Sequence, residues 1–472
     1  MPSRIDVPNR IPVVPHQPVK ADSGDAPEVV PPDPLRSIAF HLGLLLVFLR
    51  ISMLHQVQSM MMGFNLHLLY LFGIPAIIGV VAAGGLRRAF RGRPAYYWTG
   101  FAIWMFLAVP FSSYRRDSAE LLLTYLRTDL IMLFVTAGLA VSWRECKQLM
   151  HAIAWGVVVN LMCARIFLKA MGYENRVSLE FGTISNPNDL AAHLLFALPF
   201  LLWVAMSSKF ILMRIFAILG VVYGLYVILG TGSRGAVMGL GVATVYFLLR
   251  GTVRQRLALV AIAPIVAGVL LTVVPSRILQ RLTSFSASSA DAAEDAIASS
   301  MTREYLLKTS IRYTLQYPLF GVGPGQFSSF EGMHNQIVGT HGVWQEAHNT
   351  FTQVSSECGI PAAILFIAGI VSTFLLLNRT FRQARNRPDC ADIRAAVFCV
   401  SLALLAFCTV IAFVNFAYFF YLPAMAGMAI AMSKAAQIEF HFRSQTSEDT
   451  VPVGGGFTPS PPMARAARQP LS

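Results

Sequence analysis

The sequence is 472 residues long, with 55% hydrophobic residues, 13% charged residues and a mean hydropathy of +0.58. A soluble domain carries about a quarter charged residues, so this composition excludes a soluble globular protein. The net charge of +13 lies mostly in short loops between apolar runs, where charge sets membrane topology, which argues against nucleic-acid binding. The six cysteines have no CxxC spacing, which argues against a zinc site and a disulfide framework.

The apolar runs have the length of transmembrane helices, about 20 residues each. The strand-length alternation that is typical of outer-membrane barrels is missing. We therefore predict an all-α, polytopic membrane fold with about 12 transmembrane helices, and we expect no cleavable signal peptide before the first run. The predicted spans are 38–54, 66–84, 96–112, 119–141, 148–171, 187–206, 209–230, 233–249, 256–274, 359–377, 392–414 and 416–433.

The chain divides into five parts. Residues 1–36 are rich in proline and residues 434–472 are polar, so both are predicted to be disordered tails. Residues 37–274 hold the first nine spans, 275–358 form a large loop before the tenth, and 359–433 hold the last three. Lys and Arg number fourteen in the loops after the second, fourth, sixth, eighth and tenth spans and four in the alternate set. This positive-inside bias predicts cytoplasmic termini and a periplasmic loop in a bacterial inner membrane.

The periplasmic loop is the only long polar insertion in the chain. Its first part, SASSADAAEDAIASS, is small and polar, and we expect it to be mobile. An amphipathic helix that lies on the membrane surface is predicted over 302–317. Pro318 ends this helix. The apolar residues that recur every four positions along it are Leu307, Ile311 and Leu315.

Two further features organise the end of the loop. The segment GVGPGQF is predicted to be a tight turn, because no strand-turn-helix context supports nucleotide binding by its glycines. Asn349 or Thr350 is a candidate cap of the helix that leads into the tenth span.

Three arginines fall toward the outer side of predicted spans. Arg234 lies among glycines in ILGTGSRGAVMGLG, and Arg127 and Arg165 lie in the fourth and fifth spans. An arginine within a span is a candidate functional residue, although it can also extend to the lipid headgroups. Its guanidinium binds phosphate oxygens in two-point fashion and stays charged. Arg234, converging with Arg303 of the loop, would suit a lipid-linked diphosphate.

The loop holds the densest set of chemically capable side chains. His348 is a candidate general base for an acceptor hydroxyl, because the ordinary pKa of histidine lies near neutral. A histidine before a helix is more often structural, so the residue alone leaves both interpretations open. The set comprises Arg303, Arg312, His334, His341, Glu346 and His348.

Four segments in this order resemble the O-antigen ligase and O-antigen polymerase superfamily, membrane glycosyltransferases that act on undecaprenyl-diphosphate-linked glycans. They are FGTISNPNDLAAHLL, GTGSRGAVMGL, TREYLLKTSIRYTLQYPLFGVGPGQF and HNTFTQVSSECGIPAAILF. Each motif is loose and the ordered set is fairly specific. Together with the spans, the resemblance covers roughly residues 170–435 and implies a GT-C-like arrangement.

The resemblance implies roles for particular residues. The span arginine of the family falls on Arg234 and its loop arginine on Arg303, which implies that both bind the donor diphosphate. Its loop histidine falls on His348, which implies activation or orientation of the acceptor hydroxyl. Arg176 and Asn188 match less tightly as shapers of the donor pocket, and Arg127 and Arg165 remain candidates for substrate binding. The implied reaction is metal-independent, inverting and without a cofactor.

The motifs do not separate a ligase, which transfers glycan to lipid A-core, from a polymerase, which joins repeat units of O-antigen, capsule or exopolysaccharide. A flippase or transporter of lipid-linked glycan is a second class of function. It predicts charges at mid-depth in several spans and symmetry between halves, whereas the ionisable residues here gather toward the outer face. A non-catalytic membrane scaffold is a third class, and it leaves Arg234, Arg303 and His348 unexplained.

Overall fold

The computed structural model describes residues 33–167, 169–170, 176–179, 182–184, 186–283, 292–337 and 344–449. Within these ranges the chain is helical apart from loops and one short antiparallel pairing, in which Lys169 faces Ser178 and Ala170 faces Val177. The predicted all-α fold is confirmed. Most of both predicted tails and His341 lie outside the described residues.

A helix lies at each predicted span. These helices are α1 (Pro34–Ser52), α3 (Leu68–Ala82), α5 (Arg93–Ala108), α6 (Arg115–Thr124) continuing through the π-helical η2 (Tyr125–Leu130) into α7 (Ile131–Leu139), α8 (Trp143–Phe167), α9 (Pro187–Ser207), α10 (Ile211–Gly230), α11 (Arg234–Arg250), α12 (Val253–Val273), α16 (Thr350–Arg385), α17 (Ala391–Val410) and α18 (Tyr421–Asp449).

The remaining elements are shorter or belong to the loop before α16. They are α2 (Leu54–Met62), α4 (Gly85–Phe90), η1 (Val109–Phe111), β1 (Lys169–Ala170), β2 (Val177–Ser178), η4 (Gly182–Ile184), α13 (Ser276–Thr283), α14 (Ala292–Gln316), α15 (Phe327–Ile337), η5 (Pro388–Cys390) and η6 (Ile411–Phe413).

Eight helical segments among the described residues are long and apolar enough to cross a membrane. They contain α1, α6 with α7, α8, α9, α10, α12, α16 and α17. Of the other predicted spans, α3 is a shorter apolar helix of 15 residues, and α5 and α11 have 16 and 17 residues. The chain is a polytopic α-helical membrane protein.

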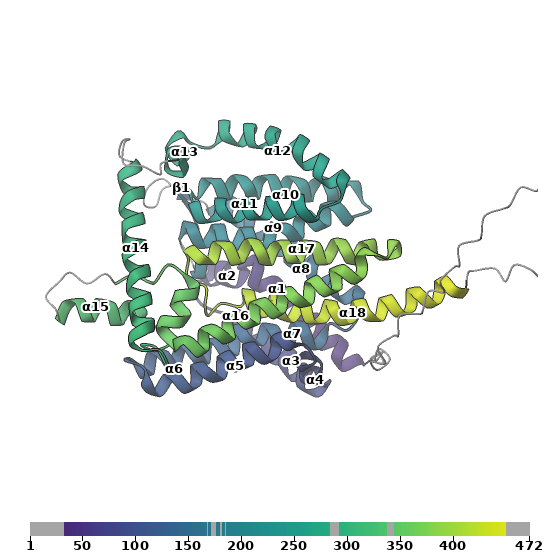
Figure 1. The fold of residues 1–472 in the computed structure, drawn as a ribbon. Helices are drawn as coiled ribbons and strands as arrows, with labels where there is room; N and C mark the ends of the chain where they lie inside the picture. The colour runs from purple at the N-terminus through teal and green to yellow at the C-terminus, as the bar shows by residue number, and fades with distance from the viewer. Residues whose placement is uncertain are drawn as a thin grey trace, which may run out of the picture.

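The bundle is centred on α9 and α17. Both are mostly apolar and bury most of their residues, 15 of 21 in α9 and 13 of 20 in α17, as expected for helices in an interior. α9 packs against α8, α10 and α17, whereas α17 packs against α11 and α16. At the periphery, α12 buries only Leu270, and Figure 1 shows it outside α10 and α11.

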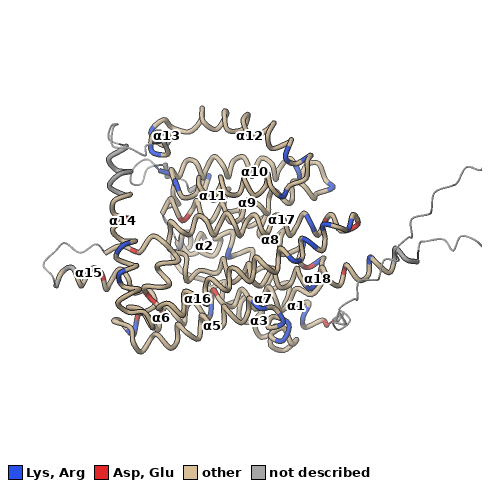
Figure 2. Tube along the Cα trace, viewed as in Figure 1, with Lys and Arg blue, Asp and Glu red and all other residues tan. Residues whose placement is uncertain are grey.

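One end of the bundle is covered by the loop before α16. Figure 1 shows α14 running across the ends of the long helices, with α13 and α15 at the same end. Lys and Arg gather at the opposite end, near the place where α18 leaves the bundle, and again around α13 and α14 (Figure 2). The chain thus places a second group of basic residues at the end that the loop covers.

α14 is longer than the helix predicted over 302–317. It begins at Ala292 and ends at Gln316, two residues before the predicted stop at Pro318. Within SASSADAAEDAIASS, residues 292–300 form the first turns of α14, and the expected mobility of this segment stays a prediction. Alanine has the highest helix propensity, and several alanines occupy this part. Residues 284–291 lie outside the described ranges.

Candidate functional site

The GVGPG segment forms a turn against the first part of α16. Gly359 breaks α16 with a φ of 83°, and a Cβ atom there would lie 2.1 Å from the carbonyl oxygen of Leu319. Only glycine permits this approach. The predicted turn is confirmed. Its N–H groups donate to carbonyls of α16 at 2.9 Å, from Val322 to Ser356 and from Gly323 to Glu357.

Glu357 fixes this turn from within. Its side chain is fully buried, and its carboxyl oxygens accept the N–H groups of Gly325 at 3.0 Å and Phe327 at 3.3 Å. The hydroxyl of Tyr418 donates to the same carboxyl group at 2.6 Å. A buried carboxyl group needs such partners. The bonds join α15, α16 and the segment before α18. The turn that follows α14 is therefore held in place.

A second buried carboxyl group joins α14 to α15. Glu331 of α15 accepts the hydroxyl groups of Tyr305 and Tyr313, both on α14. Arg312 of α14 lies 3.8 Å from the same carboxyl group. α14, which carries Arg303, is therefore anchored along its second half.

His348 lies directly before α16 at the same end of the bundle. Its φ of 52° is in the left-handed region, which few side chains adopt. The next residue, Asn349, caps α16, because its side chain accepts the N–H groups two and three residues ahead at 2.9 and 3.1 Å. The Thr350 hydroxyl donates to the carbonyl of Val414 at 2.7 Å and accepts the N–H of Phe416 at 2.9 Å. The predicted cap is confirmed at Asn349, and the backbone directly after His348 is fixed by these bonds.

Arg176 and Arg234 approach the site from either side of the α10–α11 connection. The Nε of Arg176 donates to the carbonyl of Thr231 at 2.7 Å, and its Nη2 donates to Oδ1 of Asn188 at 3.0 Å. Arg234 is the first residue of α11, and the side chain of Ser233 caps this helix. The predicted pocket residues Arg176 and Asn188 therefore contact each other and border the segment that carries Arg234.

Two further arginines complete a cluster over Gly232. A Cβ atom on Gly232 would lie 3.3 Å from Cδ of Arg281 and 3.6 Å from Nε of Arg176. Arg303, on α14, is close enough to Arg234 and Arg281 for their positive charges to act on it. Burial lowers the pKa of the Arg303 guanidinium, and the positive charges of Arg234 and Arg281 lower this pKa further. We call Arg176, Arg234, Arg281 and Arg303 the arginine cluster.

His348 lies beside this cluster. Burial, and then the positive charge of Arg303, lower the pKa of His348 to about 4, so its imidazole is neutral at pH 7. A neutral imidazole has one nitrogen that accepts a proton or hydrogen bond. The arrangement therefore offers several guanidinium groups for a polyanion and one neutral base next to them. The predicted site residues that the structure brings together are Arg176, Asn188, Arg234, Arg303 and His348.

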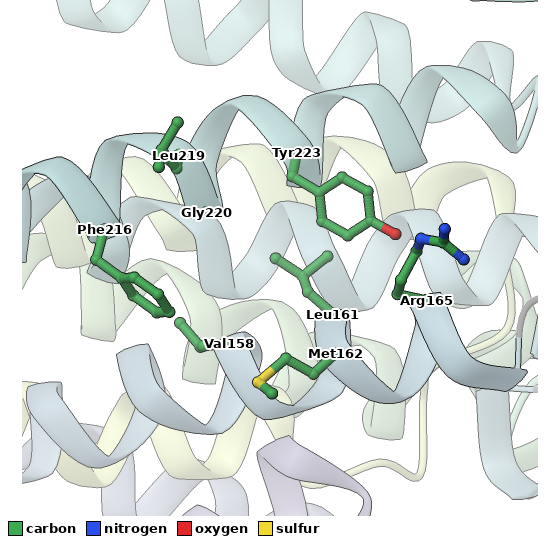
Figure 3. A pocket seen from close by; sticks show the side chains of 8 residues that line it. All are labelled: Val158, Leu161, Met162, Arg165, Phe216, Leu219, Gly220 and Tyr223. Carbon is green, nitrogen blue, oxygen red and sulfur yellow. The ribbon is translucent and has the colours of Figure 1, made fainter.

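Arg127 and Arg165 are placed elsewhere. Arg127 is exposed, lies 5.5 Å over the ring of Tyr70 and donates to Thr124. Arg165 is exposed at the end of α8, beside a groove of about 250 Å³ between α8 and α10. Figure 3 shows it next to the hydroxyl of Tyr223, with apolar side chains along the rest of the groove. Substrate binding by these two arginines stays a prediction.

Arg281 and Glu357 are not among the residues that the sequence predicts for the site. Arg281 is buried on α13, and its only sequence signal is a three-residue spacing from the apolar Ile278, which puts both on one helix face. Glu357 lies within the segment HNTFTQVSSECGIPAAILF, but its role depends on a turn that lies about 30 residues earlier in the chain. Of the other candidates, His334 stacks on Phe330 within α15.

Comparison with known proteins supports the resemblance seen in the sequence. Residues 219–367 match the family model described as O-Antigen ligase. This range contains Arg234, Arg281, Arg303 and His348. No curated protein matches the chain significantly. Residues 219–367 are therefore similar to the O-antigen ligase family, and this match supports the resemblance to the O-antigen ligase and polymerase superfamily.

Proposed function

We propose that this protein transfers a glycan from an undecaprenyl-diphosphate carrier to a sugar hydroxyl acceptor, in the biosynthesis of a surface polysaccharide. The family match supports a membrane enzyme of the ligase or polymerase type at a coarse level. The observation that carries the proposal is the position of the arginine cluster beside a neutral His348.

The arginine cluster suits the diphosphate of the donor. Arg234 and Arg303 come from different elements, α11 and α14, and their charges are close enough to interact. Guanidinium groups bind phosphate oxygens in bidentate fashion. Preorganised positive charge stabilises the negative charge that develops on a departing diphosphate. Arg176, held by Asn188, shapes the wall of this pocket.

His348 acts as the general base in this proposal. The acceptor oxygen attacks the anomeric carbon from the face opposite the diphosphate, so the configuration inverts. The bond from this carbon to the diphosphate oxygen breaks, its electron pair leaves with the diphosphate, and the acceptor proton passes to His348. Without a donor, the positive charge of Arg303 lowers the pKa of His348. The negative charge of the bound donor offsets this effect and raises the pKa of His348. Donor binding therefore makes His348 a stronger base when the substrate is in place. The step is metal-independent and uses no cofactor.

We place the reaction at the periplasmic face of a bacterial inner membrane, with both termini in the cytoplasm. The bias of Lys and Arg toward one set of loops supports this orientation. The site lies at the end of the bundle that the loop before α16 covers (Figure 1). At this level a lipid-linked donor and a glycan or lipid A-core acceptor would meet.

The test is a glycan profile of a deletion strain complemented with wild type, His348→Ala, Arg234→Ala or Arg303→Ala. Arg116→Ala is the matched control, because its side chain is 89% exposed. We expect the control to complement and the three site variants to lose polymer at normal membrane levels. Single repeat units accumulating on the carrier indicate a polymerase, and long carrier-linked chains with rough lipopolysaccharide indicate a ligase. Full complementation by all three site variants would refute the proposal and favour the transporter or scaffold interpretation.

A further inference from the structure

Arg281 is an unusual residue of α13. This helix has eight residues and follows Pro275. Arg277 on the same helix is exposed, whereas Arg281 has an exposed fraction of only 9%. Arg281 shares its buried face with Ile278, which is 4% exposed. The helix thus carries one ordinary surface arginine and one arginine that is turned toward the bundle.

The buried face of α13 packs over the α10–α11 connection. A Cβ atom on Gly232 would lie 3.3 Å from Cδ of Arg281 and 3.7 Å from Cγ2 of Ile278. Gly232 has a φ of 60°, so glycine is favoured there for its backbone as well as for the space above it. The absence of a side chain lets the stem of Arg281 lie against the loop that leads into Arg234.

The charge of Arg281 lies among other positive charges. It is close enough to interact with the guanidinium groups of Arg234 and Arg303. Burying cations side by side is unfavourable, and an arginine at a lipid surface can normally extend to the headgroups. The fold instead directs Arg281 inward, over the connection that leads into Arg234, so its positive charge adds to those of Arg234 and Arg303 at the place where a polyanion would bind.

We infer that Arg281 is a third diphosphate-binding residue, which acts with Arg234 and Arg303 on the lipid-linked donor. This inference rests on the proposed function and assigns α13 to the donor site. A diphosphate diester carries about two negative charges, and its terminal phosphate gains up to about one more on release, because the second pKa of a phosphate monoester is near 6. Arg281 supplies the cation that matches this additional charge as the bond to the sugar breaks.

The test measures binding of inorganic diphosphate by isothermal titration to the full-length protein in phosphatidylcholine nanodiscs. The variants are Arg281→Gln, Arg281→Lys and Arg303→Gln, and Arg277→Gln is the control for charge loss on the same helix. Loss of one charge-assisted contact weakens binding roughly ten- to hundred-fold. We expect this loss for Arg281→Gln, a smaller loss for Arg281→Lys, and affinity within about two-fold of wild type for Arg277→Gln. Thermal unfolding of each variant shows whether it is folded.

The outcomes separate the inference from the proposed function. If Arg303→Gln weakens binding while a folded Arg281→Gln binds like wild type, the inference about Arg281 is wrong and the proposed function stands. If wild type does not bind diphosphate, both are wrong. A second set of nanodiscs contains phosphatidylglycerol. If this anionic lipid abolishes diphosphate binding, and Arg281→Gln still binds like wild type in phosphatidylcholine, Arg281 serves phospholipid headgroups instead.

Discussion

The protonation of His348 should be set by the arginine cluster, and this can be measured without the natural substrates. In the folded protein its pKa is lowered from 6.5 to about 4, first by burial and then by Arg303. At pH 5 a histidine with a pKa of about 4 is about 90% neutral, whereas one with a pKa of 6.5 is about 3% neutral. The neutral fraction at this pH therefore differs by about thirty-fold between the folded and the unfolded chain.

Diethyl pyrocarbonate reports this fraction, because it acylates only the neutral imidazole. We expect labelling of His348, followed by mass spectrometry and expressed at pH 5 relative to pH 8, to stay near its plateau in the folded protein. In protein unfolded with denaturant the same ratio should fall by about thirty-fold. The ratio corrects for differences in access, since each state is compared with itself.

Arg303→Gln then tests the electrostatic part of the shift. Removing this positive charge raises the pKa of His348, so labelling at pH 5 should decrease. Saturating inorganic diphosphate should likewise decrease the labelling of His348 at pH 5 in wild type. Arg312→Gln, on the same helix as Arg303, is the control and should label like wild type. A folded-state midpoint near 6.5, or a midpoint that Arg303→Gln leaves unchanged, would refute the coupling between His348 and the cluster.

Two further predictions concern the scaffold of the site. In Glu357→Gln, an amide NH2 group faces hydrogen-bond donors that the carboxyl group of Glu357 accepts. This variant should lower the free energy of unfolding by about 2–3 kcal/mol and open the turn to limited proteolysis. The control is Glu304→Gln, in an exposed pair with Lys308, which should change this energy by less than about 1 kcal/mol; equal effects of both variants would contradict the role of Glu357. Thr350→Val removes both hydrogen bonds to the segment before α18. It should lower the free energy of unfolding by about 1–3 kcal/mol, and with it the melting temperature and the polymer yield in cells. Thr352→Val, whose hydroxyl makes one 3.4 Å contact, is the control that should behave like wild type.

The helical fold could be predicted from local properties of the sequence. Long apolar runs form helices in a membrane because every backbone polar group must be satisfied within the segment. The cap at Asn349 and the helix end before Pro318 follow from short-range chemistry, which a few residues specify. The start of α14 at Ala292 was missed because the prediction used apolar spacing. The first turns of that helix instead form from alanine-rich sequence with little apolar periodicity.

The site could be predicted only in part. Arg234, Arg303 and His348 were selected by motifs and a resemblance, and the structure brings them to one end of the bundle. Arg281 could not be selected, because its position depends on how α13 folds back over Gly232. The same limit applies in the opposite direction to Arg127 and Arg165. Arg127 contacts Tyr70 instead, and Arg165 borders the α8–α10 groove.

The way in which the cluster is anchored explains how the fold tolerates it. Arg176 donates to neutral groups, a backbone carbonyl and the amide of Asn188. Arg303 lies on α14, which Glu331 ties to α15 at a distance from the cluster. Arg176 is thus held by hydrogen bonds to neutral groups, and Arg303 is held by a helix that is anchored elsewhere, so both guanidinium groups are positioned by the surrounding structure. Such preorganisation stabilises an anion without reorganising the site. A site of this kind should gain most when its ligand carries the most negative charge, which is the released diphosphate.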